Sequence, residues 1–303
     1  MRDLKEFSAA DWLQLQPLQD GFKQLRNDIV QAVYVRRRPK ALEKFLQDIA
    51  YLKGRNVLLV VAFEQPWVLD WLMKMASRHL ADATLLVFDN SHRDDKRAEI
   101  ERVCRDRNVA YLGLPHNPTR HVNRSHGMAM TWIFDNVVRA IQPRIAGFID
   151  HDLIPMETIE VGRILGDQSF FGAPNFSQWG WSLWAGYCLY DFASVRERRL
   201  NFLYDFSREL DTGGRNWSRL YRNHDRSRFR FSDRRALEVT DPATGTRRRL
   251  EVVDDQWLHL CGVGYNDNFR TRSDFFGRIA QAVDEGASLP QLLGDAGAGP
   301  ARG

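Results

Sequence analysis

Apolar residues in the first 52 positions recur every three or four residues, the spacing of one face of a helix. The clearest set is Leu18, Phe22, Leu25, Ile29 and Val33. Pro17 stands in what would be the first helical turn, where a missing N–H costs least. The same spacing returns between residues 42 and 52. Residues 1–54 are therefore predicted to form an N-terminal helical extension.

From residue 56 the pattern changes to short apolar runs separated by amphipathic segments. The runs are typical of strands covered on both faces and occupy residues 56–63, 83–91, 109–117 and 145–152. The amphipathic segments predict helices at residues 65–80, 93–108 and 125–141. This alternation predicts an α/β fold: a mostly parallel sheet flanked by helices and joined by right-handed crossovers.

The pattern after residue 168 is less regular. Strands are predicted at residues 169–176 and 181–192, a helix at 193–210, and a turn that opens a further helix at 211–223. Residues 247–265 predict a strand followed by a loop, and the small residues of 286–303 a flexible tail. We therefore expect an α/β domain over residues 55–270, followed by a C-terminal helix and flexible tail over 271–303.

Composition changes this picture little. The chain is 44% hydrophobic and 27% charged, as in soluble globular proteins. No apolar run is long enough to cross a bilayer, and the N-terminus lacks a signal-peptide core, so we expect a cytoplasmic protein. The three cysteines are far apart, which favours free thiols.

Arginine is unevenly placed, although the net charge is only +4. Clusters lie at residues 35–40, 222–235 and 246–250. They are either solvated surface or contacts to an anionic partner; without a nucleic-acid motif we expect no nucleic acid. Because Arg36, Arg37 and Arg38 follow an amphipathic helix, we hypothesise peripheral association with the inner face of a membrane.

Polar residues close three of the four predicted strands of the first half. Glu64 follows the first strand, Asp89 and Asn90 follow the second, and Asp150-His151-Asp152 closes the fourth. Ligands of such sheets bind outside the carboxyl ends of the strands. Asp150 and Asp152 point the same way because side chains alternate along a strand. They can hold a hard cation such as Mg²⁺ or Mn²⁺, or else cap a helix or pair with arginine.

This order of strands, with Asp-x-Asp closing the fourth, resembles the nucleotide-sugar-dependent glycosyltransferases of the GT-A (Rossmann-like) fold, and within them family 2. The resemblance covers roughly residues 55–265. It implies that Asp150 and Asp152 bind Mn²⁺ or Mg²⁺ on the donor's diphosphate. It also implies that His259 is a further metal ligand. The alternative for His259 is a role in the core, because a lone histidine among apolar residues is often a core residue.

The same resemblance implies the donor site. Phe63 and Glu64 stand where the first strand meets the nucleoside, and Asp89 with Asn90 would reach the base or ribose. Arg124 and His126 belong to the segment that passes the diphosphate, and Gly186 lets the backbone approach the donor. For the strand-exit residues and this segment, packing and helix capping are the alternatives.

For the chemistry, the resemblance implies Asp211 as the catalytic base of an inverting enzyme, although Leu210 stands where such enzymes normally carry glutamate. Capping of a helix is the alternative for Asp211. Trp181, Trp184 and Trp217 are assigned to the acceptor, with core packing as their alternative. The partners would be a nucleotide-diphosphate sugar and a glycan or lipid-linked acceptor.

Two rival functions remain open from the sequence. A sugar-phosphate nucleotidyltransferase of related fold would carry a Gly-rich, basic loop after the first strand, and residues 62–68 contain neither Gly, Arg nor Lys. A non-catalytic binding module with basic patches would not need acids at three strand ends.

Overall fold

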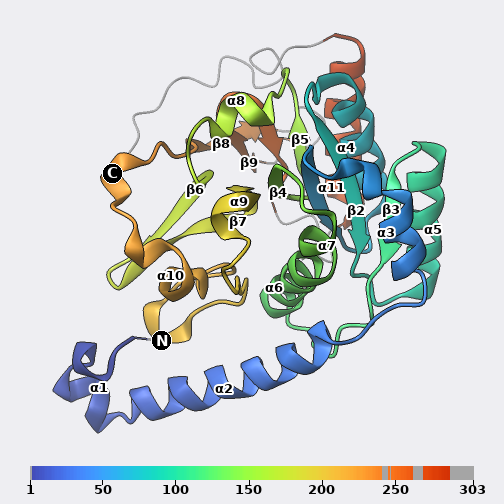
Figure 1. Ribbon diagram of the computed structural model, residues 1–303. Helices are drawn as coiled ribbons and strands as arrows, with labels where there is room; N and C mark the ends of the chain where they lie inside the picture. Colours follow the sequence, from blue (N-terminus) through green and yellow to red (C-terminus); the bar gives the residue numbers. More distant parts are fainter. Residues whose placement is uncertain (1, 241–244, 246, 262–268, 287–303) are drawn as a thin grey trace.

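The computed structural model describes residues 2–240, 245, 247–261 and 269–286 (Figure 1). Its centre is a six-stranded sheet in the order β3-β2-β1-β4-β7-β6. The parallel strands are β1 (Asn56–Ala62), β2 (Ala83–Asp89), β3 (Ala110–Gly113) and β4 (Ile145–Asp150). Two antiparallel strands, β7 (Gly180–Asp191) and β6 (Phe170–Ser177), complete the sheet beside β4. The predicted α/β class with a mostly parallel sheet is confirmed.

Helices cover both faces of this sheet because side chains alternate along its strands. Leu58 and Val60 of β1 pack with helices α4 (Pro66–His79) and α5 (Asp94–Asp106). Val57 and Leu59 point the other way, toward α3 (Leu42–Asp48) and α6 (Val122–Ile133). Every residue of β1 is buried. A π-helical turn (Phe134–Val138) and α7 (Arg139–Ile141) prolong α6.

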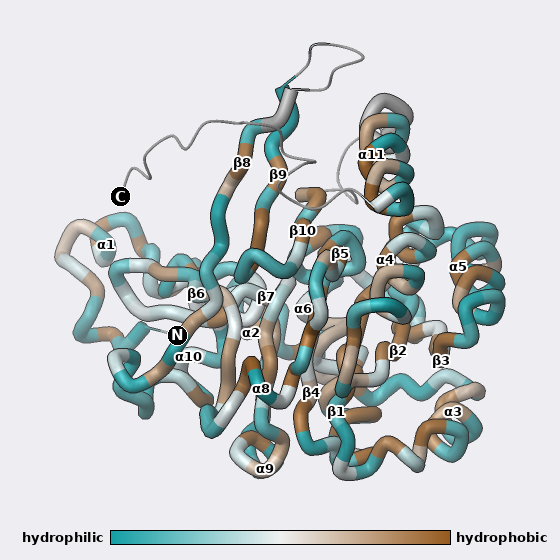
Figure 2. The backbone as a smooth tube through the Cα atoms, turned by 90° about the horizontal axis from the view of Figure 1, so that it is seen from above, coloured by the Kyte–Doolittle hydropathy of each residue, from teal (hydrophilic) through white to brown (hydrophobic). Residues whose placement is uncertain are grey.

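A second, antiparallel sheet has the order β5-β10-β9-β8. Its strands are β5 (Leu153–Pro155), β10 (Trp257–His259), β9 (Arg247–Val253) and β8 (Arg234–Thr240). Helix α11 (Phe269–Asp284) lies beside α4 in both views (Figures 1 and 2), where Lys74 and Asp284 form an ion pair of 2.5 Å. Within the described residues 247–261, the predicted strand and loop over residues 247–265 form the two paired strands β9 and β10, and residues 262–265 lie outside the described residues.

The predicted helix over residues 193–210 is wrong. Helix α9 (Phe192–Val195) ends early, and the chain then runs irregularly through short helices: η4 (Phe206–Arg208), α10 (Asn216–Arg219), η5 (Tyr221–Asn223) and η6 (Arg226–Arg228). In this segment, side-chain oxygens instead of helical carbonyls accept hydrogen bonds from backbone amides. The amides of Asn201 and Phe202 donate to Asn216 Oδ1 (2.7 Å) and Thr131 Oγ1 (3.0 Å). The apolar residues that suggested a helix are buried without forming one.

The N-terminal residues are helical, as expected. They form η1 (Leu4–Glu6), α1 (Ala9–Leu13), the long helix α2 (Gln16–Val35), α3 and η2 (Ala50–Leu52), while a further short helix, α8 (Val161–Leu165), precedes β6. Helix α2 runs along one side of the molecule (Figure 1). Among the described residues, no helix combines the length and the hydropathy needed to cross a membrane. The division at residues 54 and 270 stays a prediction, and residues 287–303 of the predicted tail lie outside the described residues.

Candidate metal and substrate site

The register of the parallel strands brings the predicted strand-end residues to one edge of the sheet. Ala62 at the end of β1 pairs with Asp89 of β2, and Val61 pairs with Asp150 of β4. Parallel strands share their carboxyl edge, so residues that are far apart in sequence meet there. This edge forms one wall of a cavity of about 230 Å³.

Two carboxylates and one imidazole form a compact group in the cavity. Asp150, Asp152 and His259 each offer a ligand atom, and these atoms lie within 4.8 Å of one another. His259 Nε2 is 3.5 Å from Asp152 Oδ1 and 4.0 Å from Asp150 Oδ2. Both Asp152 and His259 are buried, with 5% and 8% of their surface exposed. Two carboxylate oxygens beside an imidazole nitrogen suit a divalent cation.

Strand pairing places His259 there. In β10, His259 pairs with Leu153 of β5, the residue that follows Asp152. The backbone amide of Leu260 donates to the Asp152 carbonyl at 3.1 Å, which fixes the two segments side by side. His151 turns away from the group, since its Nδ1 lies 3.3 Å from the Val61 carbonyl oxygen.

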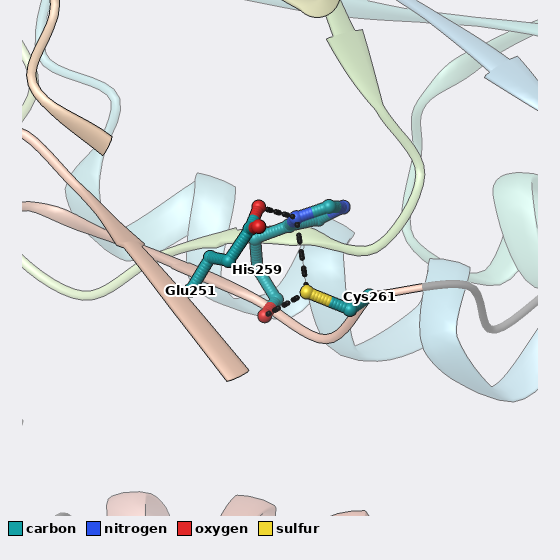
Figure 3. A group of neighbouring side chains, drawn as sticks. All are labelled: Glu251, His259 and Cys261. Carbon is teal, nitrogen blue, oxygen red and sulfur yellow. Dashed lines mark hydrogen bonds and ion pairs between the residues drawn. The ribbon is translucent and has the colours of Figure 1, made fainter. Parts of the chain in front are cut away.

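The other ring nitrogen of His259 faces Glu251 and Cys261 (Figure 3). Nδ1 lies 3.0 Å from Glu251 Oε2 and 3.5 Å from Cys261 Sγ. Burial would lower the pKa of His259, but Asp152, Cys261 and Glu251 together outweigh it and raise that pKa well above its usual value. Conversely, the hydrogen bond from His259 lowers the pKa of Glu251.

This arrangement orients the imidazole. An Nδ1–H that donates to a carboxylate turns Nε2 toward the ligand, a pattern common behind metal-binding histidines. Glu251, His259 and Cys261 also form a second group within 4.8 Å. The thiolate of Cys261 in this second group would select softer metals than carboxylates do. We therefore interpret Glu251 as the partner that holds His259 toward Asp150 and Asp152.

His126 approaches the acids from α6. Its Nε2 lies 3.7 Å from Asp150 Oδ1. Burial lowers the pKa of His126, and the carboxylate of Asp150 offsets this only in part. A neutral imidazole here can donate a hydrogen bond without adding positive charge.

Nine of the residues that the sequence suggested for the site line this one cavity. They are Phe63, Asn90, His126, Asp150, Asp152, Trp184, Gly186, Asp211 and His259. Phe63 makes an edge-to-face contact with His92, with ring centroids 5.7 Å apart. The side chain of Asn90 donates to Ser125 Oγ at 2.8 Å, which ties β2 to the start of α6. The strand ends and the second half of the chain therefore contribute to the same space.

Gly186 is required by the close packing of the cavity wall. A Cβ atom at this position would lie 2.3 Å from Asp150 Oδ2 and 2.2 Å from Trp184 Cζ2. The Trp184 ring in turn contacts the His259 ring edge-to-face, with centroids 4.8 Å apart. A side chain at residue 186 would therefore displace both the acid and the ring.

Asp211 is exposed at the opposite wall. Its Oδ1 accepts hydrogen bonds from Asn123 Nδ2 (2.8 Å) and from the Thr212 amide (2.7 Å). No hydrogen bond to Oδ2 is found among the described residues. The carboxylate is thus held by one oxygen, with the other available to a molecule in the cavity.

The structure places Glu64 and Asp89 outside the cavity lining. Glu64 Oε1 accepts from the amides of His92 and Arg93 at 3.2 and 3.3 Å, so it holds the turn between β2 and α5. Asp89 is fully buried and accepts from the Ser91 amide (2.8 Å) and the Tyr111 hydroxyl (3.1 Å). Burial, and then Asp89, raise the pKa of Tyr111.

Three further predicted residues also lie outside the lining. Arg124 turns toward Tyr204, whose hydroxyl accepts from Nε and Nη2 at 3.1 and 3.0 Å. Trp181 is 5% exposed and stacks on Tyr221, with centroids 4.8 Å apart. Trp217 packs edge-to-face on Trp181. The two tryptophans form a ring cluster, which is the core packing that stood as the alternative.

Sequence reasoning missed several residues that belong to the site. His92, Arg120 and Thr212 line the cavity, and Glu251 orients His259. Arg120 stands in the long polar segment before α6, a loop composition typical of binding loops. Glu251 gave no such signal, because its role depends on pairing between β9 and β10, where it stands opposite His259.

Comparisons with known proteins add little. No protein-family model matches the sequence, and no curated protein matches it. Similar solved structures include the bifunctional glycosyltransferase WbbM without ligand (TM-score 0.34, 13% identity) and the galactosyltransferase LgtC in complex with donor and acceptor sugar analogues (TM-score 0.33, 13% identity). The matches cover 48% and 46% of this chain, and 32% and 59% of those chains. Similarities this low do not establish a family.

Proposed function

We propose that the chain is a divalent-metal-dependent, inverting glycosyltransferase that moves a sugar from a nucleotide-diphosphate donor to a hydroxyl acceptor. One observation carries the proposal: Asp150, Asp152 and His259 share a cavity with the exposed carboxylate of Asp211. A cation-binding group and a separate proton acceptor are what this reaction needs.

Asp150, Asp152 and His259 would hold the cation, Mn²⁺ or Mg²⁺. When bound, it supplies Lewis-acid stabilisation of the negative charge on the departing diphosphate. Glu251 keeps His259 Nε2 aimed at the two acids. Gly186 leaves room for Asp150 Oδ2, which any larger residue would displace.

The donor would lie between the strand ends and the start of α6. Phe63 and His92 offer adjacent ring surfaces for a nucleobase. Arg120, exposed at the cavity wall, offers a guanidinium for phosphate oxygens. His126 is close to Asp150, and its lowered pKa keeps it neutral, so it donates a hydrogen bond without competing as a cation.

In the proposed reaction, Asp211 is the proton acceptor. The acceptor hydroxyl oxygen attacks the anomeric carbon, the bond from that carbon to the diphosphate oxygen breaks, and the hydroxyl proton passes to Oδ2 of Asp211. Asn123 and Thr212 hold Oδ1 and so fix the carboxylate during the transfer. Trp184 offers an apolar ring to the acceptor. That acceptor would be a glycan or a lipid-linked sugar.

A donor panel tests this function. Release of nucleoside diphosphate is measured for UDP-, GDP- and dTDP-sugars with Mn²⁺ and after chelation with EDTA. We expect one nucleotide class to be turned over with Mn²⁺ and not after chelation. Asp152→Ala should abolish release, while the matched variant Asp167→Ala, which changes an exposed acid outside the cavity lining, should not. Chelator-resistant release, or wild-type release by Asp152→Ala, contradicts the proposal, as does no release from any donor.

A further inference from the structure

Helix α2 exposes a continuous row of apolar side chains. We call this row the apolar stripe; it consists of Leu15, Leu18, Phe22, Leu25, Ile29 and Val33. Phe22 is 72% exposed, Leu18 61% and Leu25 58%. Single exposed apolar residues are ordinary, but a contiguous row along five helical turns marks a contact surface.

The opposite face of α2 is polar and buried, the reverse of an ordinary surface helix. Gln31 Nε2 donates to Thr131 Oγ1 (2.9 Å) and to Asn201 Oδ1 (3.2 Å). Asp28 forms an ion pair of 2.9 Å with Arg215. These bonds join α2 to the body of the protein by its polar face, so the apolar stripe is held outward.

The charges beside the apolar stripe have one sign. Between Trp12 and Arg38 the exposed charged residues are all basic: Lys23, Arg26, Arg36, Arg37 and Arg38. The two acids of this segment are occupied or hidden, because Asp20 is 7% exposed and Asp28 pairs with Arg215. The outward face of α2 is therefore apolar and cationic.

We infer that the apolar stripe docks on the surface of a bilayer that contains anionic phospholipids. Apolar side chains enter the boundary between headgroups and acyl chains, while flanking Lys and Arg meet lipid phosphates. A second copy of the chain is the less suitable occupant, because facing stripes would bring Lys23 and Arg26 near the same residues of the other copy. Docking is independent of the proposed function and places the protein on a surface, whatever its substrate.

Vesicle flotation tests the docking. Wild-type protein should float with phosphatidylglycerol–phosphatidylcholine vesicles, and binding should fall at high salt and on pure phosphatidylcholine. The double variant Phe22→Gln/Leu25→Gln should lose on the order of tenfold or more in binding. Lys23→Gln/Arg26→Gln should lose on the order of tenfold. Tyr51→Gln, which changes an aromatic residue 59% exposed outside the apolar stripe, should bind as wild type.

Three results overturn the inference. The first is equal binding to neutral and anionic vesicles, and the second is wild-type binding by both double variants. The third is a wild-type dimer in light scattering without vesicles that becomes a monomer in Phe22→Gln/Leu25→Gln, since a second copy would then cover the apolar stripe. Because all five substituted residues are exposed, melting temperatures should match the wild type and show that the variants are folded.

Discussion

Asp150 and His259 lie in the same group of ligand atoms, yet they reach it by different routes. Asp150 belongs to the carboxyl edge of consecutive parallel strands, which we call the strand-end wall: the ends of β1, β2 and β4. His259, Gly186 and Asp211 form the facing wall, built from β7, β10 and the irregular chain after α9. The strand-end wall follows from a regular repeat, whereas the facing wall depends on contacts between distant segments. Small geometric changes in the facing wall should therefore alter the site most.

Two tryptophans of β7, Trp181 and Trp184, should have different roles: the first in packing and the second in binding the acceptor. Trp181 is buried in the ring cluster, so Trp181→Ala should lower the free energy of unfolding by about 3–5 kcal/mol. Trp184 lines the cavity, so Trp184→Ala should destabilise less but raise the KM for acceptor. Urea unfolding and transfer kinetics of both variants check this. If Trp181→Ala is as stable as wild type and raises the acceptor KM, the ring cluster is an acceptor surface after all.

Asp211, the proposed catalytic base in the facing wall, should give the next largest effect. Asp211→Asn should reduce transfer by roughly a hundredfold or more, because it removes the proton acceptor but keeps an oxygen for Asn123 and Thr212. Donor binding should stay unchanged. Asp225→Asn is the matched control, since Asp225 also accepts from a nearby amide but lies outside the cavity lining. Near-normal transfer by Asp211→Asn would leave this residue a purely structural role.

The closeness of the two walls can be disturbed at Gly186. Gly186→Ala should shift Asp150 and Trp184, and a misplacement of about 1 Å costs up to roughly a hundredfold in rate. Gly277→Ala in α11 is the control, because a Cβ there meets no atom within 4 Å. Metal affinity and transfer rate are the measurements. Unaltered values for Gly186→Ala would mean that Asp150 does not act from the position seen here.

The smallest effect is expected behind His259. Glu251→Gln should weaken Mn²⁺ binding by about tenfold, the low end for partners of a metal-binding histidine, since an amide oxygen still accepts from Nδ1. Glu238→Gln on the neighbouring strand β8 should have no effect. If both variants bind Mn²⁺ alike, Glu251 does not orient the histidine.

The same contrast explains what the sequence allowed us to predict. The alternation of residues 56–150 predicted the parallel strands, and strand order then placed Asp150 and Asn90 at one edge. The sequence pattern did not predict the facing wall. In residues 196–215, hydrogen bonds to side chains, such as that from the Asn201 amide to Asn216, take the place of helical hydrogen bonds. A buried residue that the sequence suggested for the site need not belong to it. Asp89 accepts a hydrogen bond from the Ser91 amide in the turn after β2, and Trp181 packs in the core.

Binding of Mn²⁺, followed by its electron paramagnetic resonance signal, tests the central claim most directly. The wild-type protein should bind Mn²⁺, and a nucleoside diphosphate should tighten that binding. Asp152→Ala should lose both effects while keeping its circular dichroism spectrum, and Asp167→Ala should behave as wild type. Wild-type Mn²⁺ affinity in Asp152→Ala, with or without the diphosphate, would contradict a metal site at the end of β4.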